Sequence, residues 1–512
     1  MPEIKSARLF DFICVALLLA FALAIAYPRW RAGIDWRDEG LLAYGSERVM
    51  LGEVPHRDFV SLQPPLSFYA VAALFKIGGT SLFTLRLLGL SIFLLLPLLI
   101  YGVARSLGST PVLSFAAAAP ACVLGLPYTL FVPLAVWQGI AASFAAVFFF
   151  TRATLSARRW LALVAGLFTA CALFLRHDQA AYTMVAILAL VLALSFASDP
   201  VRKDKLRRAL LFWLAGTAII AIPALIIWSQ IGALPEMFQQ LVVFPFATYR
   251  KTSALPFPKI TAGKTAVETA VVLLFYLPVF VQIVTALYLA QSIVRRRFGR
   301  REAILAFLLV WSALFFLQVM VRSDQTHLLI TLPPLFLLAA FAWSIVQETI
   351  VKHRKTRIAL SAVLAIAVAS YLWVLHSVML PDVTRAQDQL SLERGEVRVS
   401  GASVITNFVH KLQNGVPPTR SILALPYQPM FYFLCERRNP TRWNYLWPGD
   451  QTAQDHARFI EESERDPPAR ILLSEQRELA ESAPAILEYV RIHYLLTDQF
   501  GNLSIYERLD SR

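Results

Sequence analysis

Runs of apolar residues long enough to cross a membrane constrain this chain more than any other feature. FICVALLLAFALAIAY begins at residue 12 and LSIFLLLPLLIYGVA at residue 90. A membrane-spanning helix needs about 20 such residues. Only 16% of the residues are charged, against about 25% in soluble proteins. The chain is therefore predicted to be a mainly α-helical, polytopic membrane protein.

Eleven spans are predicted from the apolar runs, and the first is interpreted as an uncleaved helix. They lie near 9–27, 83–104, 111–126, 129–150, 161–175, 180–197, 209–229, 267–293, 303–321, 328–347 and 358–378. Every second connection is basic, for example RKDKLRR and RRRFGRR. Basic connections stay in the cytoplasm. This pattern predicts a cytoplasmic N-terminus, with the 28–82 loop, the 230–266 loop and the C-terminal region outside.

Two stretches fit this scheme less simply. Pro120, Pro127 and Pro133 interrupt 111–150, which has to cross twice to keep the flanking arginines on one side. The segment 64–79 is apolar but too short to span. Two prolines begin it and two glycines end it, as expected for a short helix, which we predict to lie at the membrane interface.

The sequence predicts two domains, a membrane domain over 1–379 that includes the external loop 28–82, and a small extracytoplasmic α/β domain over 380–512. In the second domain GASVITNFVHKLQNG and DHARFIEESERD are predicted helices, SILALP and ARILLSE short strands, and HYLLTDQFGNLSIYERL a hairpin. From residue 380 onward 15 Lys and Arg face 18 Asp and Glu, so the net charge of +14 comes from the membrane part. We therefore expect no nucleic-acid partner.

The first external loop carries an unusual density of charge, DWRDEGLLAYGSERVMLGEVPHRDF at 35–59. Asp38 and Glu39 precede a helical stretch and are candidate catalytic carboxylates. In the alternative, purely structural interpretation, Asp38 caps the helix and Glu39 sits favourably on its dipole. The two interpretations are compatible, because a capped carboxylate is held rigidly.

Basic side chains recur in the other predicted external loops. Arg176 and Arg322 each stand two residues before an aspartate, and Lys251 and His327 lie in the same kind of loop. Arginines clamp phosphate oxygens, and a carboxylate can accept the proton of an acceptor hydroxyl. Such a set suits a phospholipid-like substrate, although snorkelling to lipid phosphates is an alternative for external lysines.

No other reaction class has a sequence signature here. The chain contains no P-loop, GxGxxG, HExxH or CxxC motif. We expect no cofactor and assign no metal ligands. The spacing of Asp38, Glu39 and His327 carries no information about a metal, and a divalent metal stays open.

The ordered motifs resemble those of a known superfamily. GEVPHRDFVSLQPPLSFY follows the Asp-Glu pair, and LFLRHDQAAY, VRSDQTHLLITLPP and ILALPYQPMFYFLCERRNPTRWNYLWPG come later. The chain resembles the GT-C superfamily of membrane glycosyltransferases, close to the protein O-mannosyltransferase and lipid A aminoarabinose transferase group. His56 departs from the tyrosine that is commoner before Arg-Asp-Phe.

The resemblance implies a glycosyltransferase of the bacterial cytoplasmic (inner) membrane. Such enzymes move a sugar from a polyprenyl-phosphate donor to an extracytoplasmic acceptor, usually with inversion. It implies that Asp38 is the catalytic base or the acceptor-site carboxylate, with Glu39 as the second residue of the pair. Arg57 and Asp58 would support the loop, and Arg176, Arg322, His327 and Lys251 would bind the donor phosphate.

Two alternatives stay open at this point. One is a transporter or flippase of polyprenyl-linked sugars, which would need a polar path through the membrane. The other is a noncatalytic anchor for the outer domain. The sugar, and whether the acceptor is a lipid, a polysaccharide or a protein, are not encoded in these motifs.

Overall fold

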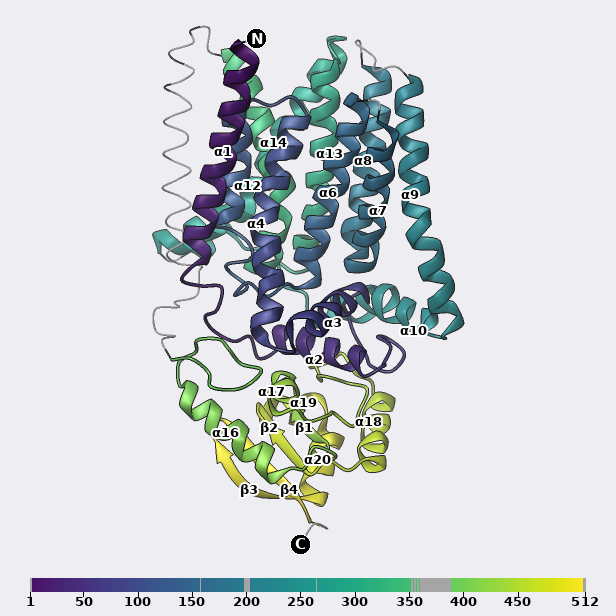
Figure 1. Cartoon of the computed structure of the whole chain (residues 1–512), viewed down its shortest axis with the longest axis vertical. Coiled ribbons are helices and arrows are strands. Elements are labelled where there is room, and N and C mark those ends of the chain that lie inside the picture. The colour runs from purple at the N-terminus through teal and green to yellow at the C-terminus, as the bar shows by residue number, and fades with distance from the viewer. Residues whose placement is uncertain are drawn as a thin grey trace. The chain divides into compact units, whose positions relative to one another are not determined.

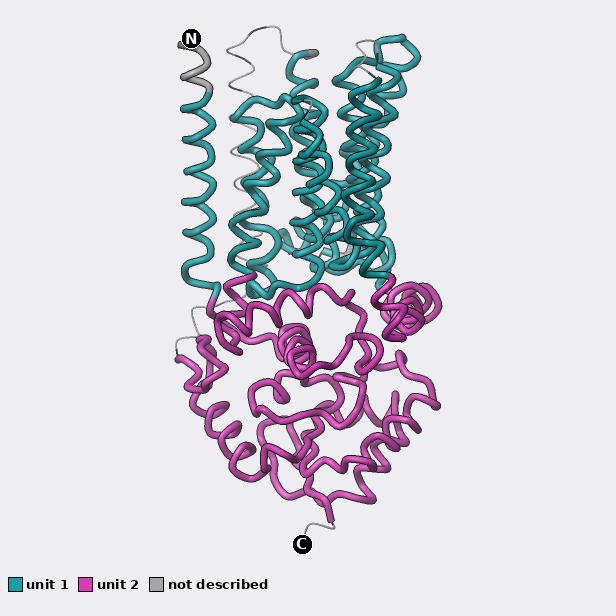
Figure 2. Tube along the Cα trace, turned by 45° about the vertical axis from the view of Figure 1, so that its right-hand side comes forward, with its two compact units in different colours: residues 1–30, 89–225, 255–381 teal, residues 31–88, 226–254, 382–512 magenta. Residues whose placement is uncertain are grey.

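Figure 1 shows the computed structural model of the chain, which describes residues 2–156, 158–197, 203–263, 265–350 and 388–509 and positions 353, 356 and 359. The chain forms two compact units, coloured in Figure 2. Unit 1 comprises residues 1–30, 89–225 and 255–381, and unit 2 comprises residues 31–88, 226–254 and 382–512. Residues 31–82 of the first predicted external loop thus belong to the same unit as the C-terminal residues.

Unit 1 is a bundle of long apolar helices, of which α4 and α9 continue into unit 2. They are α1 (Pro2–Ala26), α4 (Leu82–Ser106), α5 (Pro111–Ala118), α6 (Ala135–Ser156), α7 (Arg159–Leu175), α8 (His177–Phe196), α9 (Lys203–Gln230), α12 (Ala266–Val294), α13 (Arg300–Val321) and α14 (Gln325–Ile350), with short turns of 3₁₀-helix at Ala119–Cys122 (η1) and Ile260–Ala262 (η4).

Eight helices among the described residues are long and apolar enough to cross a membrane, and each overlaps a predicted span. The predicted span 161–175 is α7, which has 17 residues. The predicted span 111–126 contains only α5 and η1. The predicted span 358–378 lies outside the described residues, so the total of eleven stays a prediction.

The predicted start of the 129–150 span was wrong by six residues, because the chain does not become helical until Ala135. Leu130 and Phe131 have positive φ angles of 54° and 60°, and Pro133 has no N–H to donate. The irregular chain lies against α4 at Gly89, where an added Cβ would stand 1.7 Å from the carbonyl oxygen of Phe131. Glycine at position 89 is what permits this close approach.

The interior of unit 1 is packed with aromatic rings whose polar atoms are satisfied. Trp311 packs against Phe144 in a tilted arrangement with ring centroids 4.6 Å apart, and its Nε1 donates to Thr183 at 3.2 Å. Trp213 on α9 donates to Thr169 on α7 at 2.9 Å. Each indole therefore has the partner that a buried N–H needs.

Unit 2 combines helices with one small sheet. Its helices are α2 (Asp38–Met50), α3 (Leu66–Gly78), α10 (Leu234–Phe238), α11 (Arg250–Thr252), α16 (Ala402–Gly415), α17 (Met430–Cys435), α18 (Ala453–Arg465), α19 (Gln476–Ser482) and α20 (Pro484–His493), with π-helical turns at Gln239–Val243 (η2) and Pro245–Tyr249 (η3). The predicted short helix at 64–79 is confirmed as α3, which is followed by the C-cap residue Gly79 with a φ of 86°.

The sheet has the order β1-β2-β4-β3 and confirms the predicted C-terminal elements. Strands β1 (Ile422–Leu425) and β2 (Arg470–Leu473) pair in parallel, and β3 (Tyr494–Phe500) and β4 (Leu503–Arg508) form the predicted antiparallel hairpin. Helix α18, predicted from DHARFIEESERD, carries a Thr452 capping box. The predicted boundary near residue 380 stays a prediction.

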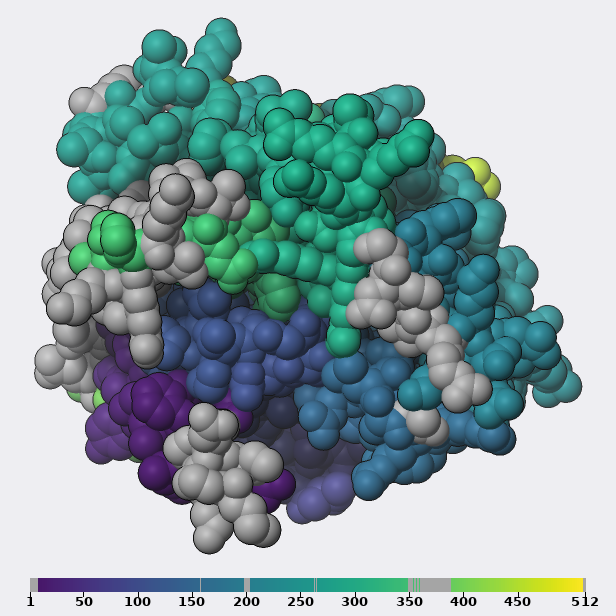
Figure 3. Space-filling model, turned by 90° about the horizontal axis from the view of Figure 1, so that it is seen from above, coloured from purple at the N-terminus to yellow at the C-terminus, as the bar shows by residue number. Residues whose placement is uncertain are grey.

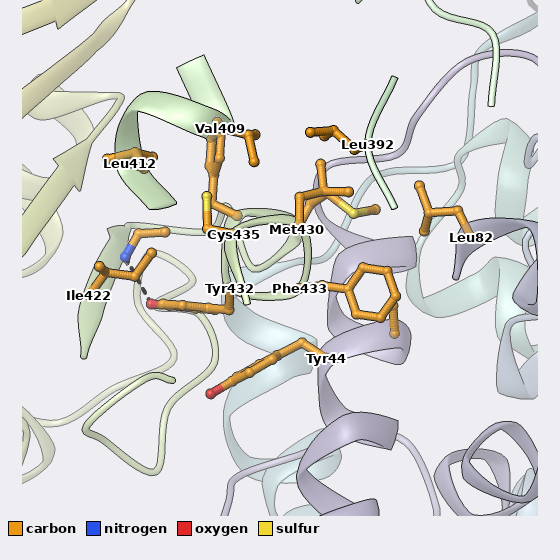
Figure 4. Close-up of a cluster of buried hydrophobic side chains, with 14 of the residues drawn as sticks. Tyr44, Leu82, Leu392, Val409, Leu412, Ile422, Met430, Tyr432, Phe433 and Cys435 are labelled. Atoms are coloured by element: carbon orange, nitrogen blue, oxygen red, sulfur yellow. Dashed lines mark hydrogen bonds between the residues drawn. The ribbon is translucent and has the colours of Figure 1, made fainter. Parts of the chain in front are cut away.

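A buried core joins α2 and α3 to the C-terminal part of unit 2 through the short helix α17 (Figure 4). Tyr44 and Tyr432 lie with ring centroids 4.9 Å apart, and Phe75 stacks on Phe433. The Tyr432 hydroxyl accepts the N–H of Ala424 in β1 at 2.9 Å. The Tyr44 hydroxyl accepts the N–H of Asn439 at 2.7 Å, so α2 is tied to the chain beyond α17.

We predict that Tyr432→Phe destabilises unit 2. The substitution leaves the buried N–H of Ala424 without a partner, which costs about 1–3 kcal/mol. The thermal unfolding temperature of the detergent-solubilised protein should fall. Tyr506→Phe is the control, because Tyr506 is also buried and its hydroxyl has no hydrogen-bond partner among the described residues. An equal drop in both variants would contradict the prediction.

Candidate functional site

The start of α2 holds Asp38 at the surface of unit 2. The helix begins at Asp38 itself. The Asp35 carboxylate accepts the backbone N–H groups of Arg37 at 2.9 Å and Asp38 at 3.0 Å. The interpretation of Asp38 as the helix cap was therefore wrong, because Asp35 supplies the side-chain acceptor. The Asp38 side chain is exposed at the positive end of the helix dipole.

The next residue, Glu39, is fully buried in a two-point ion pair with Arg86. Arg86 Nε lies 2.6 Å from Glu39 Oε1, and its Nη2 lies 2.7 Å from Oε2. Both side chains are 0% exposed. Arg86 also donates to the carbonyl oxygens of Ala32 and Gly33 at 3.1 and 2.8 Å, and Glu39 accepts the N–H of Asp35 at 3.2 Å. This network fixes the turn that leads into α2 against the start of α4.

Arg57 and Asp58 form a second, exposed pair in the turn at 54–59. Arg57 Nε and Nη2 lie 2.8 and 2.7 Å from the two oxygens of Asp58. Asp58 also accepts the N–H of Val54 at 2.7 Å. The Arg57 guanidinium, with this backbone hydrogen bond, holds the pKa of Asp58 below its ordinary value despite partial burial. The carboxylate thus closes the turn.

Sequence reasoning missed the residues that hold His56. The His56 backbone has a φ of 73°, and its ring is buried. Its Nδ1 lies 2.9 Å from Oε1 of Gln240 in η2, and its carbonyl oxygen accepts Arg442 at 3.1 Å. Gln240 Oε1 also accepts the N–H of Ser61 at 3.0 Å. A glutamine in an apolar loop has no spacing signature that could have identified it.

In unit 1 the two Arg-x-Asp motifs form equivalent corners between helices. Arg176 lies between α7 and α8, and its Nε is 3.0 Å from Asp178. Arg322 lies between α13 and α14, and its Nε is 2.6 Å from Asp324. Gln318 Nε2 donates to Asp178 at 2.8 Å. The end of α13 is therefore bonded to the start of α8, a link that no sequence pattern indicated.

His327 completes the second corner. Its Nδ1 and its backbone nitrogen lie 2.7 and 2.8 Å from Asp324 Oδ1. Burial raises the pKa of Asp324, but hydrogen bonds from His327 and Arg322 outweigh it and leave that pKa well below the ordinary value. Asp324 is thus an anion between two basic side chains, and the structure brings Arg322 and His327 together through it.

The remaining predicted residue, Lys251, is exposed on α11 in unit 2. Its neighbour Thr252 donates to Asp450 at 3.0 Å. Burial raises the pKa of Asp450 to about 6. Burial and the charges of Asp450 and Asp38 also raise the pKa of Tyr445. The charges of Asp38 and Asp450 therefore both act on Tyr445, which the sequence did not reveal.

No metal-binding group is evident in the part of the chain that the structure describes. No three His, Cys, Asp or Glu side chains there are arranged to hold a metal ion. Asp38 and Glu39 lie in unit 2 and His327 in unit 1. Metal dependence stays untested.

No protein-family model and no curated protein matches the sequence. Solved structures do match. The oligosaccharyltransferase AglB from Archaeoglobus fulgidus, in complex with an inhibitory peptide and a dolichol-phosphate, has a TM-score of 0.59 at 9% identity, over 99% of this chain and 75% of that one. ArnT from Cupriavidus metallidurans, bound to undecaprenyl phosphate, has a TM-score of 0.58 at 13% identity, over 98% of both chains.

The arabinofuranosyltransferase AftD from Mycobacteria is a third match, with a TM-score of 0.52 at 13% identity. The match covers 98% of this chain but 40% of AftD. At such identities the likeness establishes the fold. The chain has the GT-C fold, and the predicted fold class is confirmed.

We predict that the Glu39–Arg86 pair is strongly coupled. Arg86→Met should leave a buried, unpaired carboxylate and destabilise the protein by about 3–5 kcal/mol. Glu39→Gln/Arg86→Met should be less destabilised than Arg86→Met alone, because it removes the stranded charge. Thermal unfolding of the single and double variants measures this coupling.

The exposed pair Arg477–Glu481 is the control, with side chains 93% and 69% exposed. Arg477→Gln should change stability by less than about 0.5 kcal/mol. A double variant as unstable as Arg86→Met would contradict the coupling.

We also predict a pH-dependent effect of Asp450→Asn. A carboxyl whose pKa is raised on folding destabilises the folded state as the pH rises from its ordinary value of 3.8 through about 6. The variant should therefore unfold at a higher temperature than wild type at pH 8, with a smaller gain at pH 5.

Asp498→Asn is the matched control of opposite sign. Lys411 lowers the pKa of Asp498, so its loss should lower the unfolding temperature at pH 8, if only slightly at this exposed site. A loss of stability in Asp450→Asn at pH 8 would show that its charge is favourable instead.

Proposed function

We propose that this protein is a glycosyltransferase that moves a sugar from a polyprenyl-phosphate donor to an extracytoplasmic acceptor with inversion, using Asp38 as the base. One observation carries the proposal. Asp38 is an exposed carboxylate at the start of α2, and the buried Glu39–Arg86 pair holds that helix start rigidly. A general base needs this combination of access and fixed position.

The proposed reaction is one displacement. The acceptor oxygen attacks the anomeric carbon while its proton passes to the Asp38 carboxylate. The bond between the anomeric carbon and the phosphate oxygen breaks, and polyprenyl phosphate leaves with the electron pair. One base suffices, because a phosphate leaves without strong acid assistance.

The leaving phosphate needs positive charge around it. We assign this role to Arg176, Arg322, His327 and Lys251. Asp178 and Asp324 orient the two arginines through Nε, and a guanidinium has further N–H groups to offer. Glu39, Arg57 and Asp58 are positioning residues, since their side-chain contacts are with the protein itself.

The fold supports a lipid-linked donor. ArnT with this fold is bound to undecaprenyl phosphate, and AglB to a dolichol-phosphate. We propose in addition that the protein lies in the bacterial inner membrane, with a cytoplasmic N-terminus and the C-terminal region outside. The acceptor is a lipid, a polysaccharide or a protein.

The test is donor consumption by membranes that contain wild type, Asp38→Asn or Asp38→Glu. Each receives a panel of labelled polyprenyl-phosphate sugars, and donor and product fractions are counted. Wild type should consume one donor. Asp38→Asn should lose turnover by a factor of at least about 100, as expected for loss of general-base catalysis, and Asp38→Glu should retain part of it.

Glu481→Gln is the control, because it neutralises an exposed carboxylate on another helix of unit 2 and should leave turnover unchanged. Equal consumption by wild type and Asp38→Asn would refute the base assignment. Transport of intact donor across the membrane, without consumption of any donor, would favour a flippase.

A further inference from the structure

A cavity of about 230 Å³ lies at one end of the unit 1 helices. The ends of α4, α6 and α8 and the starts of α9 and α13 enclose it. Its polar lining consists of Ser106, Thr151, Thr154, Lys205 and Arg300, and the rest is leucine and isoleucine. Figure 3 looks onto this end of unit 1. The cavity is smaller than the roughly 300–1,000 Å³ that encloses a whole drug-sized ligand.

This cavity is distinct from the two Arg-x-Asp corners. The cavity is lined by Arg300, the first residue of α13, whereas Arg322 follows the last residue of that helix. The helix has 22 residues, so about 33 Å of helix separates the two. The cavity is also lined by Leu194 near the end of α8, whereas Arg176 directly precedes the first residue of α8. The proposed donor site therefore does not explain it.

The electrostatics of the cavity favour an anion. Lys205 and Arg300 bring two positive charges, and neither has an ion-pair partner within the described ranges. Helices α9 and α13 begin here, so the positive ends of two helix dipoles add to the same field.

Among the described residues, the carboxylates nearest in sequence, Asp204 and Glu302, form no ion pair with Lys205 or Arg300. Glu302 accepts the N–H of Gly299 and the Tyr288 hydroxyl, both at 2.9 Å. Asp204 is exposed, and adjacent residues on a helix do not face each other.

The hydroxyl groups contribute little further donor capacity. Ser106 Oγ and Thr151 Oγ1 lie 2.6 Å apart, and each also reaches a carbonyl of its own helix. Thr154 Oγ1 donates to the Thr151 carbonyl at 2.7 Å. The anion would therefore be held by the side chains of Lys205 and Arg300.

Other features of this end suit a lipid rather than a free ion. Leu155 lines the cavity and is 46% exposed. Trp160, at the start of α7 next to the end of α6, is 55% exposed. Tryptophan is enriched at the level of lipid headgroups. Cationic side chains thus lie next to exposed apolar side chains, and a phospholipid has a phosphate next to apolar chains in the same way.

We infer that this cavity binds the phosphate of an anionic lipid headgroup, with Lys205 and Arg300 as its ligands. Bound lipid would tie the start of α9 to the start of α13. The inference does not depend on the proposed glycosyl transfer, because lipid binding is its readout.

The test compares full-length protein in detergent with added phosphatidylglycerol, phosphatidylcholine or inorganic phosphate. Native mass spectrometry measures bound lipid, and thermal unfolding measures the stabilisation. Phosphatidylglycerol should bind and stabilise wild type more than the other two. Lys205→Gln/Arg300→Gln should weaken that binding about 30-fold, since each basic residue near an anionic headgroup is worth roughly fivefold.

Arg207→Gln/Arg208→Gln is the matched control. It removes the same charge from exposed positions of α9 outside the cavity and should keep the preference. Leu194→Phe fills the cavity, leaves both cations, and should lose the preference.

Three results would overturn the inference. An equal loss in the control would indicate general surface charge. Equal binding of phosphatidylcholine would exclude recognition of net negative charge. Full stabilisation by inorganic phosphate alone would replace the lipid with a free anion.

Discussion

The conformation of the chain at the start of α2 depends on the buried pair of Glu39 and Arg86. Neither charge reaches water, so each compensates the desolvation of the other. The carbonyl oxygens of Ala32 and Gly33 occupy further N–H groups of the guanidinium. A buried ion pair adds little net stability compared with apolar packing. What it does here is hold the turn before α2 in one arrangement, and the position of Asp38 follows from that.

The membrane helices were predictable because their signal is local. An apolar run of about 20 residues is readable wherever it stands, and eight such runs became helices of the expected kind. The signals for the hairpin at Gly501 and for helix α18 were also local. The start of α6 had no local signal. The irregular chain before Ala135 contacts Gly89, which lies 46 residues before Ala135 in the sequence.

The candidate site likewise has features that the sequence indicated and features that it did not. Its charged residues were identifiable by type and position, including the two Arg-x-Asp motifs. Their partners were not. Nothing in the spacing indicated that Arg86 pairs with Glu39, 47 residues away. Gln318 and Gln240 join segments through amides, and an amide in an apolar sequence has no pattern that marks its partner. Partner choice is a property of packing.

Helix geometry explains why two adjacent carboxylates have different environments. Consecutive residues on a helix point about 100° apart. Since Glu39 points inward to Arg86, Asp38 points to the surface, where its charge reaches Tyr445. Asp450 contributes to the same field and has a pKa of about 6. Asp38 and Asp450, which lies 412 residues later in the sequence, therefore both act on the pKa of Tyr445.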